Sequence, residues 1–467
     1  MPIATVNPAT GETVETFTPY DAAAVEQRLA LAASAYAAWR TTGFDERAAL
    51  LRRAADLLDA EREDLGRTMT VEMGKPVAAA RAEVAKCAKA MRWYADRAPE
   101  LLADEHPVAA DVADSGAGSV HVRYRPIGVV LAVMPWNFPL WQVVRFAAPA
   151  LMAGNVGLLK HASNVPRTAL ALERVLLEAG FPQGCFQTLL IGSAAVEGVI
   201  RDPRVAAVTL TGSELAGRSV ASIAGDEVKK SVLELGGSDP FLVLPSADLA
   251  GAVQWAVTAR TQNNGQSCIA AKRFIVHAEV YEAFTAAFTD RMKALKVGDP
   301  LAEETEIGPL ATRQGRADLE ELVDDAVAAG AVAECGGARP DGLPKELDGG
   351  WYYLPTVLTG ITPKMRIHHE EAFGPVATVY RVESLDEAIA VANDSPFGLS
   401  SNVWTTDPAE QERCARDIEA GGVFFNGMTA SHPAFPFGGV KRSGYGRELS
   451  GHGIREFCNI TTVWRGR

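Results

Sequence analysis

The sequence predicts an α/β protein in which two Rossmann-like parallel-sheet domains are accompanied by a small β element. Short runs rich in Val, Ile and Leu alternate with longer helical patterns over most of the chain, and this β-α-β alternation is typical of parallel sheets covered by helices. The chain has 467 residues, which is too long for one simple core and sufficient for two or three domains.

The first hundred residues are predicted to be mostly helical, and the first β-α series follows them. We expect helices over residues 22–39, 45–65 and 75–98, then a small polar stretch over 111–118 and a strand over 119–124. The series comprises strands over 127–134, 156–159, 186–191, 205–210, 231–235 and 241–244, with helices over 140–152, over 167–179 up to Gly180, and from Ser213 to about 224. Pro149 is expected to disturb the late part of the helix over 140–152.

A second β-α series begins after Cys268. Its strands are predicted over 273–277, 376–382, 402–404 and 423–425, and its helices over 280–295, 313–329, 385–392 and 410–419. The tail over 459–464 is β-prone and can pair with another strand. Glu234 therefore lies near the end of the first series and Cys268 near the start of the second, and a junction between two domains suits a cleft site.

The composition is that of a soluble globular protein, with 48% hydrophobic and 22% charged residues. A net charge of −13 argues against nucleic acid or an anionic membrane as the main partner, because phosphate groups are bound by clustered Lys and Arg. The acidic first thirty residues do not match a secretory signal, and the longest apolar stretch ends at Pro135, too early to span a membrane. The cysteines form no CxxC pair and the histidines no HxxxH or HExxH pattern, so we expect a cytoplasmic protein without disulfides or a metal site.

Three residues in turn-like settings indicate the chemistry. They are Asn137 in Pro-Trp-Asn-Phe-Pro, Glu234 in Glu-Leu-Gly-Gly and Cys268 in Gly-Gln-Ser-Cys. An ionised thiol can attack a carbonyl carbon, a partly buried glutamate can take a proton from water, and a rigid amide N–H can stabilise an oxyanion by roughly 3 kcal/mol. Together these groups can oxidise an aldehyde through a covalent thioester.

Each of these residues also has an ordinary structural explanation. A single cysteine is often a small buried hydrophobe, a carboxylate at a strand end is usually solvated, and Asn often caps its own turn. A cysteine hydrolase is a further alternative, and its required His partner could be His277 or His432. A binding or structural protein would have no reason to keep thiol, base and amide together, so their joint occurrence favours catalysis.

Two features indicate a site for a dinucleotide. Thr211-Gly212-Ser213, followed by Gly217, lies at a strand-to-helix junction, where a helix N-terminus can bind phosphate, although Ser is also a common N-cap. The pattern differs from the ordinary GxGxxG fingerprint. Lys160 ends a predicted strand, with Ser163 three residues on, and it can extend into water or reach a ribose or phosphate.

With these motifs, the chain resembles the NAD(P)-dependent aldehyde dehydrogenase superfamily over essentially its whole length. The resemblance rests on the motifs above and on Glu-Ala-Phe-Gly-Pro (371–375) and Pro-Phe-Gly-Gly (436–439). Within the superfamily the chain is most similar to bacterial succinate-semialdehyde dehydrogenases, through residues 160–164, 268–273 and 444–450.

The resemblance implies a role for each motif. Cys268 would be the nucleophile, Glu234 the base for deacylation, and Asn137 with the backbone N–H of Cys268 the oxyanion hole. The implied cofactor contacts are Trp136, Lys160, Ser163, Gly212, Ser213, Gly217, Leu235, Glu371 and Phe373. Many NAD-specific relatives carry Glu at the position of Ser163, and that carboxylate would repel a 2′-phosphate, whereas a hydroxyl and Lys160 can accept one. NADP is therefore favoured, with NAD as the alternative.

The resemblance also implies a substrate and an assembly. Arg145 would bind the far carboxylate of succinate semialdehyde, and Ser431 or His432 would complete the pocket, while some relatives place a second arginine where this chain has Gln262. The alternatives are glutarate semialdehyde, a general aliphatic aldehyde, or a CoA-acylating dehydrogenase, although CoA-acylating relatives typically lack a base such as Glu234. The implied parts are a cofactor-binding domain (1–104 and 127–236), a catalytic domain (237–436) and an oligomerisation element (105–126 and 448–467) of a homodimer or homotetramer.

Overall fold

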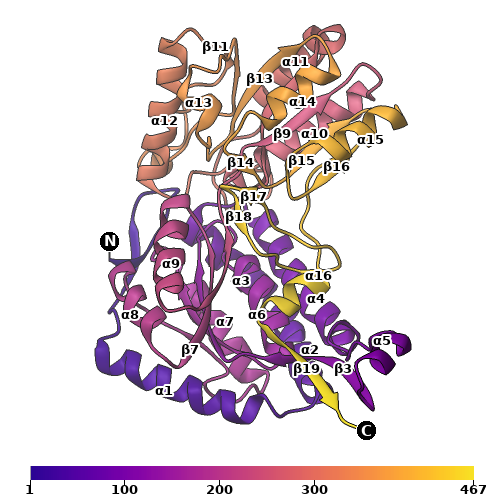
Figure 1. Cartoon of the computed structure of the whole chain (residues 1–467). Helices are drawn as coiled ribbons and strands as arrows, with labels where there is room; N and C mark the ends of the chain where they lie inside the picture. The colour runs from indigo at the N-terminus through magenta and orange to yellow at the C-terminus, as the bar shows by residue number, and fades with distance from the viewer. Residues whose placement is uncertain (1) are drawn as a thin grey trace.

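The computed structural model describes residues 2–467, which form two α/β lobes, and the predicted fold class is confirmed (Figure 1). The lower lobe of Figure 1 is built around a six-stranded sheet in the order β18-β8-β7-β4-β5-β6. Its strands are β4 (Val129–Met134), β5 (Val156–His161), β6 (Phe186–Thr188), β7 (Val205–Thr211), β8 (Lys230–Glu234) and β18 (Gly444–Tyr445). All neighbours pair in parallel except β18, which runs antiparallel to β8. The run Val-Val-Leu-Ala-Val-Met of β4 is almost entirely buried, as is typical of a parallel strand covered on both faces.

Helices cover this first sheet. They are α1 (Ala22–Trp39), α2 (Phe44–Ala60), α3 (Arg62–Met73), α4 (Val77–Leu101), α6 (Trp141–Ala153), α7 (Pro166–Glu178), α8 (Val196–Arg201) and α9 (Glu214–Asp226). Helices α1 to α4 precede the sheet in the chain, and α6 to α9 connect its strands. The helix predicted over 45–65 was wrong, because the backbone leaves helical geometry at Glu61 (φ −97°, ψ 15°) and two helices result. Pro149 lies inside α6 without ending it.

The upper lobe contains a seven-stranded sheet in the order β11-β12-β13-β10-β9-β15-β16 (Figure 1). Its strands are β9 (Asp239–Val243), β10 (Ala271–His277), β11 (Val332–Cys335), β12 (Thr356–Thr359), β13 (Val376–Val382), β15 (Ser401–Trp404) and β16 (Val423–Phe425). Only β11 is antiparallel to its neighbour. The helices are α10 (Leu249–Thr261), α11 (Ala278–Lys293), α12 (Arg313–Ala328), α13 (Arg366–His369), α14 (Leu385–Asn393) and α15 (Pro408–Asp417). The sequence did not predict α10, although Asp248 caps it.

A long antiparallel pair extends from the lower lobe and carries the C-terminus (Figure 1). Strand β3 (Ser119–Pro126) pairs with β19 (Cys458–Arg465) over eight residues, so the β-prone tail has the partner strand that the sequence left open. The other elements are β1 (Ile3–Val6), β2 (Thr13–Phe17), α5 (Ala109–Asp114), β14 (Phe397–Gly398), β17 (Val440–Lys441), α16 (Ser450–Glu456) and 3-10 turns at Ser193–Ala195, Gln262–Gly265 and Lys345–Leu347. The strand predicted over 186–191 ends at Thr188, and part of the polar stretch over 111–118 is helical.

The sheet order of the lower lobe brings three predicted site segments to one edge. Strands β4, β7 and β8 are neighbours and parallel, so their carboxyl ends lie together. These ends lead into Pro135, Gly212 and Leu235. In open α/β sheets, ligands bind outside the carboxyl ends of the strands. Within residues 2–467, none of the helices combines the length and apolar character that a membrane span requires.

Candidate active site

A cavity of about 300 Å³ joins this edge of the sheet to the second lobe. It is lined by Pro135, Trp136, Asn137, Thr211, Gly212, Ser213, Leu235, Gly236, Cys268, Glu371 and Phe373. Eight of the residues singled out from the sequence are in that set: Trp136, Asn137, Gly212, Ser213, Leu235, Cys268, Glu371 and Phe373. The cavity therefore joins a thiol and an amide to groups that were expected to hold a dinucleotide.

The thiol lies in a loop with unusual backbone geometry. Asn263, Asn264 and Gly265 are consecutive residues with positive φ (57°, 56° and 73°). A Cβ at Gly265 would lie 2.3 Å from the carbonyl carbon of Gly374, so only glycine permits this approach between the Cys268 loop and the loop that follows Glu371. Left-handed backbone is costly at the two non-glycine residues, Asn263 and Asn264, and such backbone is typical of functional loops.

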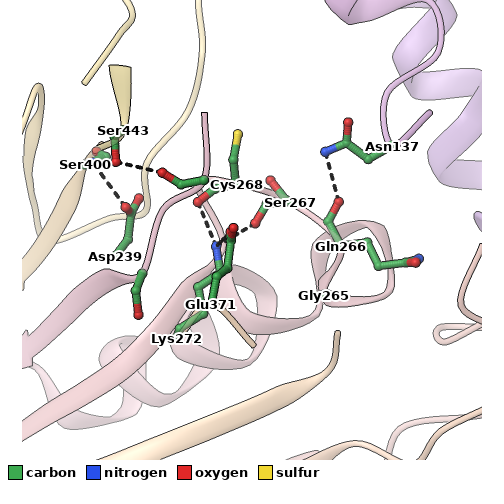
Figure 2. Close-up of polar contacts among 12 residues, drawn as sticks. Asn137, Asp239, Gly265, Gln266, Ser267, Cys268, Lys272, Glu371, Ser400 and Ser443 are labelled. Carbon is green, nitrogen blue, oxygen red and sulfur yellow. Dashed lines mark hydrogen bonds and ion pairs between the residues drawn. The ribbon is translucent and has the colours of Figure 1, made fainter. Parts of the chain in front are cut away.

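Asn137 is connected directly to the Cys268 loop. Its Nδ2 donates a hydrogen bond to the carbonyl oxygen of Gln266 at 3.2 Å (Figure 2). Asn263 Nδ2 in turn donates to the carbonyl oxygens of Asn137 at 2.7 Å and Gln266 at 3.0 Å. An amide NH₂ has two N–H groups, so one of those on Asn137 remains for a ligand.

Burial determines the protonation of Cys268. The side chain is half-buried at the cavity wall, and desolvation raises the pKa of the thiol to about 12, with Arg145 and Lys272 acting in the opposite direction. The thiol is therefore protonated at neutral pH in this structure, and it must lose its proton as it attacks a carbon. The two histidines considered as hydrolase partners are absent from the residues that line the cavity; His277 caps α11, and His432 Nδ1 accepts from the backbone of Ala434.

Glu234 is buried at the end of β8, next to the cavity-lining Leu235. Neither of its carboxyl oxygens has a hydrogen-bond partner among the described residues, and one of them would lie 2.6 Å from a Cβ at Gly438. Burial raises the pKa of Glu234 well above its usual range, and the nearby Glu448 raises it further, against the opposing charges of Arg145 and Arg447. An unpaired, desolvated carboxyl of this kind can serve as a proton acceptor with a high affinity for the proton.

Arg145 lies deep in the fold and already has a counter-ion. Its guanidinium pairs with the buried carboxylate of Glu448, donates from Nη2 to Thr211 Oγ1 at 3.3 Å and lies 4.5 Å from the ring centroid of Phe437. Burial raises the pKa of Glu448, with Arg145 opposing this shift. Arg145 therefore reaches the cavity through Thr211, and its charge is compensated within the protein.

Lys272 joins the nucleophile loop to Glu371. Its buried ammonium donates to the carbonyl oxygens of Ser267 (2.8 Å) and Cys268 (2.7 Å) and pairs with Glu371 Oε1 at 2.9 Å (Figure 2). All three N–H groups of the ammonium are thereby used. The Cys268 side chain points away from this ammonium (Figure 2), so Lys272 holds the backbone of the loop and leaves the sulfur accessible.

Replacing Lys272 with Met is expected to destabilise the protein by about 3 kcal/mol, because the largely buried Glu371 carboxylate loses its counter-ion and two carbonyls lose a donor. Urea unfolding measures this change. Lys293→Met is the matched control, because Lys293 is exposed near the end of α11, and we expect a change within about 0.5 kcal/mol. Equal losses in the free energy of unfolding in the two variants would contradict the stabilising role assigned to Lys272.

The remaining predicted residues lie outside the cavity lining. Gln262 lines a different cavity of about 510 Å³ beside α10, so the structure does not bring it to Cys268. Ser163 borders a small void under β5, and its carbonyl oxygen accepts from Ala4. Gly217 is in α9, where a Cβ would lie 2.6 Å from the Leu235 side chain, so glycine allows this helix to pack closely on the strand end. Ser431 belongs to a cluster with Lys86 and Trp141.

Two positions suit an anionic ligand. Ser213 caps α9 through a hydrogen bond from the Ala216 N–H, which places the helix N-terminus at the cavity. Lys160, at the end of β5, is 9% exposed and has no hydrogen bond or ion pair from its side chain within residues 2–467; burial lowers its pKa. In the same part of the chain, no group of three or more His, Cys, Asp or Glu side chains is placed to hold a metal ion.

Sequence reasoning missed Lys86, Lys272 and Glu448. Lys86 is half-buried on α4, three residues after the buried Glu83. A lysine that close to the buried face of a helix is the one feature of the sequence that could have pointed to it. Lys272 and Glu448 act through partners 99 and 303 positions away in the chain (Glu371 and Arg145), and such pairings cannot be read from local pattern.

The fold and this cavity define a class of protein, and comparison with known families agrees. The model of the aldehyde dehydrogenase family matches residues 1–463, and the chain belongs to that family. Two similar curated relatives are a succinate-semialdehyde dehydrogenase [NADP(+)] of Mycolicibacterium paratuberculosis (62% identity, covering 100% of this chain and 97% of the relative) and one of Mycobacterium tuberculosis strain H37Rv (62% identity, 99% and 100%). A similar solved structure is the succinic semialdehyde dehydrogenase of Streptococcus pyogenes in complex with NADP+ (38% identity, TM-score 0.95, 100% of both chains).

Proposed function

We propose that this chain oxidises succinate semialdehyde to succinate with NADP. The observation that carries the proposal is the single cavity holding Cys268, Asn137 and Glu371, in a chain 62% identical over its full length to relatives named for that reaction. The family membership supports aldehyde oxidation, and the names of the relatives support the particular substrate and cofactor.

The first step uses Cys268 and Asn137. The sulfur forms a bond to the aldehyde carbon as the thiol proton passes to a water molecule, and the carbonyl π electron pair moves to the oxygen. The free N–H of Asn137 and the backbone N–H of Cys268 can donate to that oxyanion, because the latter makes no hydrogen bond among the described residues. Each such donor can contribute about 3 kcal/mol to the transition state.

The residues present fit a nicotinamide dinucleotide phosphate. The α9 N-terminus at Ser213 can receive a phosphate, and Glu371, held by Lys272, presents a carboxylate to ribose hydroxyls. The unpaired Lys160 ammonium and Ser163 can hold a 2′-phosphate, since neither position carries a carboxylate that would repel it. When bound, the oxidised nicotinamide ring accepts the hydride from the former aldehyde carbon.

Glu234 completes the reaction by releasing the acid. Its carboxylate takes a proton from water, the resulting hydroxide adds to the thioester carbon, and the Cys268 thiolate leaves. Neither carboxyl oxygen accepts a hydrogen bond from residues 2–467, which leaves both available for that water.

We also propose that the enzyme acts in the cytoplasm as a homo-oligomer. All six cysteines are free, which suits a reducing compartment. The projecting β3–β19 pair exposes Ile460 (65%) and Trp464 (54%), apolar side chains that a second copy of the chain could cover.

A panel of aldehydes crossed with both nicotinamide cofactors tests the proposal. We expect kcat/KM to be highest for succinate semialdehyde with NADP, lower for glutarate semialdehyde, and lowest for neutral aldehydes, with no requirement for CoA. Formation of reduced nicotinamide, followed by its absorbance, is the measurement. A preference for a neutral aldehyde, or turnover only when CoA is added, would contradict the proposed substrate or the proposed hydrolysis.

A further inference from the structure

A buried ion pair at the start of α4 lies beside the loop that carries Asn137. Lys75, between α3 and α4, pairs with Glu83 in the second turn of α4, and the two side chains are 1% and 3% exposed. Removing two charges from water is costly, and replacing a buried ion pair by apolar side chains of similar volume is often neutral for stability. Stability alone therefore does not account for this pair.

The carboxylate of Glu83 caps helix α6. Its Oε1 accepts hydrogen bonds from the backbone N–H groups of Leu140 at 3.0 Å and Trp141 at 2.9 Å. Helix α6 begins at Trp141, and its N-cap residue Leu140 makes no side-chain hydrogen bond to the helix. A Ser, Thr, Asp or Asn usually supplies that cap, and the helix dipole favours a negative charge there. Glu83 thus holds, from another helix, the backbone three and four residues after Asn137.

Lys75 contacts the same loop next to Asn137. Its ammonium pairs with Glu83 Oε2, which leaves Oε1 for the two backbone N–H groups at the start of α6. The ammonium also lies 4.2 Å from the ring centroid of Phe138, the residue directly after Asn137. The ion pair therefore contacts the Asn137 loop both at a side chain and at the backbone.

The chain just before this pair holds the Cys268 loop as well. The carbonyl oxygen of Gly74, at the end of α3, accepts a hydrogen bond from Asn264 Nδ2 at 2.9 Å. Gly74 has a φ of 78°, and a Cβ there would lie 2.8 Å from the carbonyl oxygen of Pro309, so this close approach requires glycine. Asn264 is buried and precedes Cys268 by four positions. One short stretch of chain thus contacts both loops that supply the thiol and the amide.

The function of the Asn137 amide depends on its position relative to the sulfur of Cys268. Its Nδ2 is held by one hydrogen bond, to the carbonyl oxygen of Gln266 (Figure 2), and its backbone carbonyl is held by Asn263. The remaining constraint is the direction in which the chain enters α6, and Glu83 fixes that entry. A displacement of about 1 Å in such a group can slow a reaction on the order of 100-fold.

We propose that the Lys75–Glu83 pair positions the amide of Asn137 for the oxyanion, with Glu83 acting through the N-terminus of α6 and Lys75 orienting the Glu83 carboxylate. This inference rests on the proposed function, because the pair has this role only if Asn137 donates to an oxyanion. Neither Lys75 nor Glu83 lines the cavity, so both are positioning residues, and the bond-making step remains with Cys268.

Two neutral double variants test this role, because they have side chains of the same length at position 83 and leave no buried charge behind. In Lys75→Met/Glu83→Gln, the amide oxygen can still accept from the N–H groups of Leu140 and Trp141. In Lys75→Met/Glu83→Met, no acceptor remains. We expect the rate constant of the first turnover to stay within about threefold of native in the Gln variant and to fall on the order of 30-fold in the Met variant.

The measurement is the formation of reduced nicotinamide after rapid mixing of an aldehyde with NADP and a saturating excess of enzyme. The rate constant then reports only attack and hydride transfer, and molecules that fail to fold do not change it. Titration with NADP should give an affinity within about threefold of native in both variants, and urea unfolding measures their stability. Arg97→Met/Glu100→Gln is the matched control, because it neutralises an exposed ion pair of the same helix and should leave the rate constant unchanged.

A double-mutant cycle with Asn137→Ala shows whether the effect passes through the amide. In that background, Lys75→Met/Glu83→Met should lower the rate constant by less than about threefold, because the donor to be positioned is already absent. In the native background, the loss should be equal for succinate semialdehyde and for butanal, a neutral aldehyde of equal length, since both form the same oxyanion.

Four results would overturn the inference: equal rate constants in the two double variants, an equal loss with and without Asn137, a loss confined to succinate semialdehyde, or a Met variant that does not fold beside a native-like Gln variant. The last of these would leave the pair a purely structural role. A native enzyme that oxidised butanal but not succinate semialdehyde would contradict the proposed substrate and leave the positioning test intact. A native enzyme that oxidised neither aldehyde would defeat the proposed function and, with it, this role.

Discussion

Cys268→Ala is expected to abolish aldehyde oxidation, with a fall in kcat of at least about 10⁴-fold, while NADP binding persists. The reason is that the sulfur alone forms the bond to the aldehyde carbon, and alanine has no atom to replace it. The amide of Asn137 and the Glu371–Lys272 pair depend on backbone carbonyls of this loop and not on the thiol, so the cavity should keep its shape. Formation of reduced nicotinamide is the first measurement, and titration with NADP is the second.

Cys414→Ala is the matched control for this variant. Cys414 is a buried thiol on α15 in the second lobe and does not line the cavity, so its removal should leave kcat within about twofold of native. Cys268→Ser adds a finer comparison, because a hydroxyl in the same place is a far weaker nucleophile at neutral pH. Native turnover in Cys268→Ala would remove the thioester from the mechanism.

The parts of the site that sequence reasoning located are those in which chemistry and local backbone coincide. Asn137, Cys268 and Glu371 lie in loops built by Pro, Gly or Asn, and these loops meet because parallel strands end at a common edge. The alternation of elements was sufficient for the fold class, since β-α-β units determine how the strands pair. Boundaries were less accurate: the break at Glu61 divides α2 from α3 in a stretch where hydrophobic spacing continues.

The parts that sequence reasoning did not reach depend on pairings between distant residues. Arg145 was expected to bind a substrate carboxylate. In the structure it pairs with Glu448, 303 positions later, and the sequence alone does not reveal that this partner compensates its charge. Gln262, six residues before the thiol, faces another cavity because three left-handed residues turn the chain between them. Lys86 of α4 reaches Ser431, 345 positions later in the segment before Pro436, and local pattern does not reveal a contact between such distant residues.

Glu234→Gln is expected to stop turnover after the first catalytic cycle. Glutamine cannot accept a proton from water, so the thioester should form and persist, and steady-state kcat should fall by about 10² to 10⁴-fold. Rapid mixing should still show a burst of about one reduced nicotinamide for each active site, because attack and hydride transfer precede the proton transfer to Glu234. Stability should be kept, since the buried carboxyl is held largely neutral and glutamine matches its shape without the repulsion from Glu448.

The pH dependence gives an independent check on the same residue. Because burial holds the pKa of Glu234 well above its usual range, the carboxylate form becomes populated only as pH rises, and kcat should increase with pH in the native enzyme. Glu234→Gln should lose this rise, whereas Glu279→Gln, at an exposed position in the first turn of α11, should keep both kcat and the rise. Loss of the burst together with kcat would place Glu234 before the thioester, as the acceptor of the Cys268 proton, because the thiol is also protonated at neutral pH. A pH profile that is identical in native enzyme and Glu234→Gln would assign the water-activating proton transfer to another group.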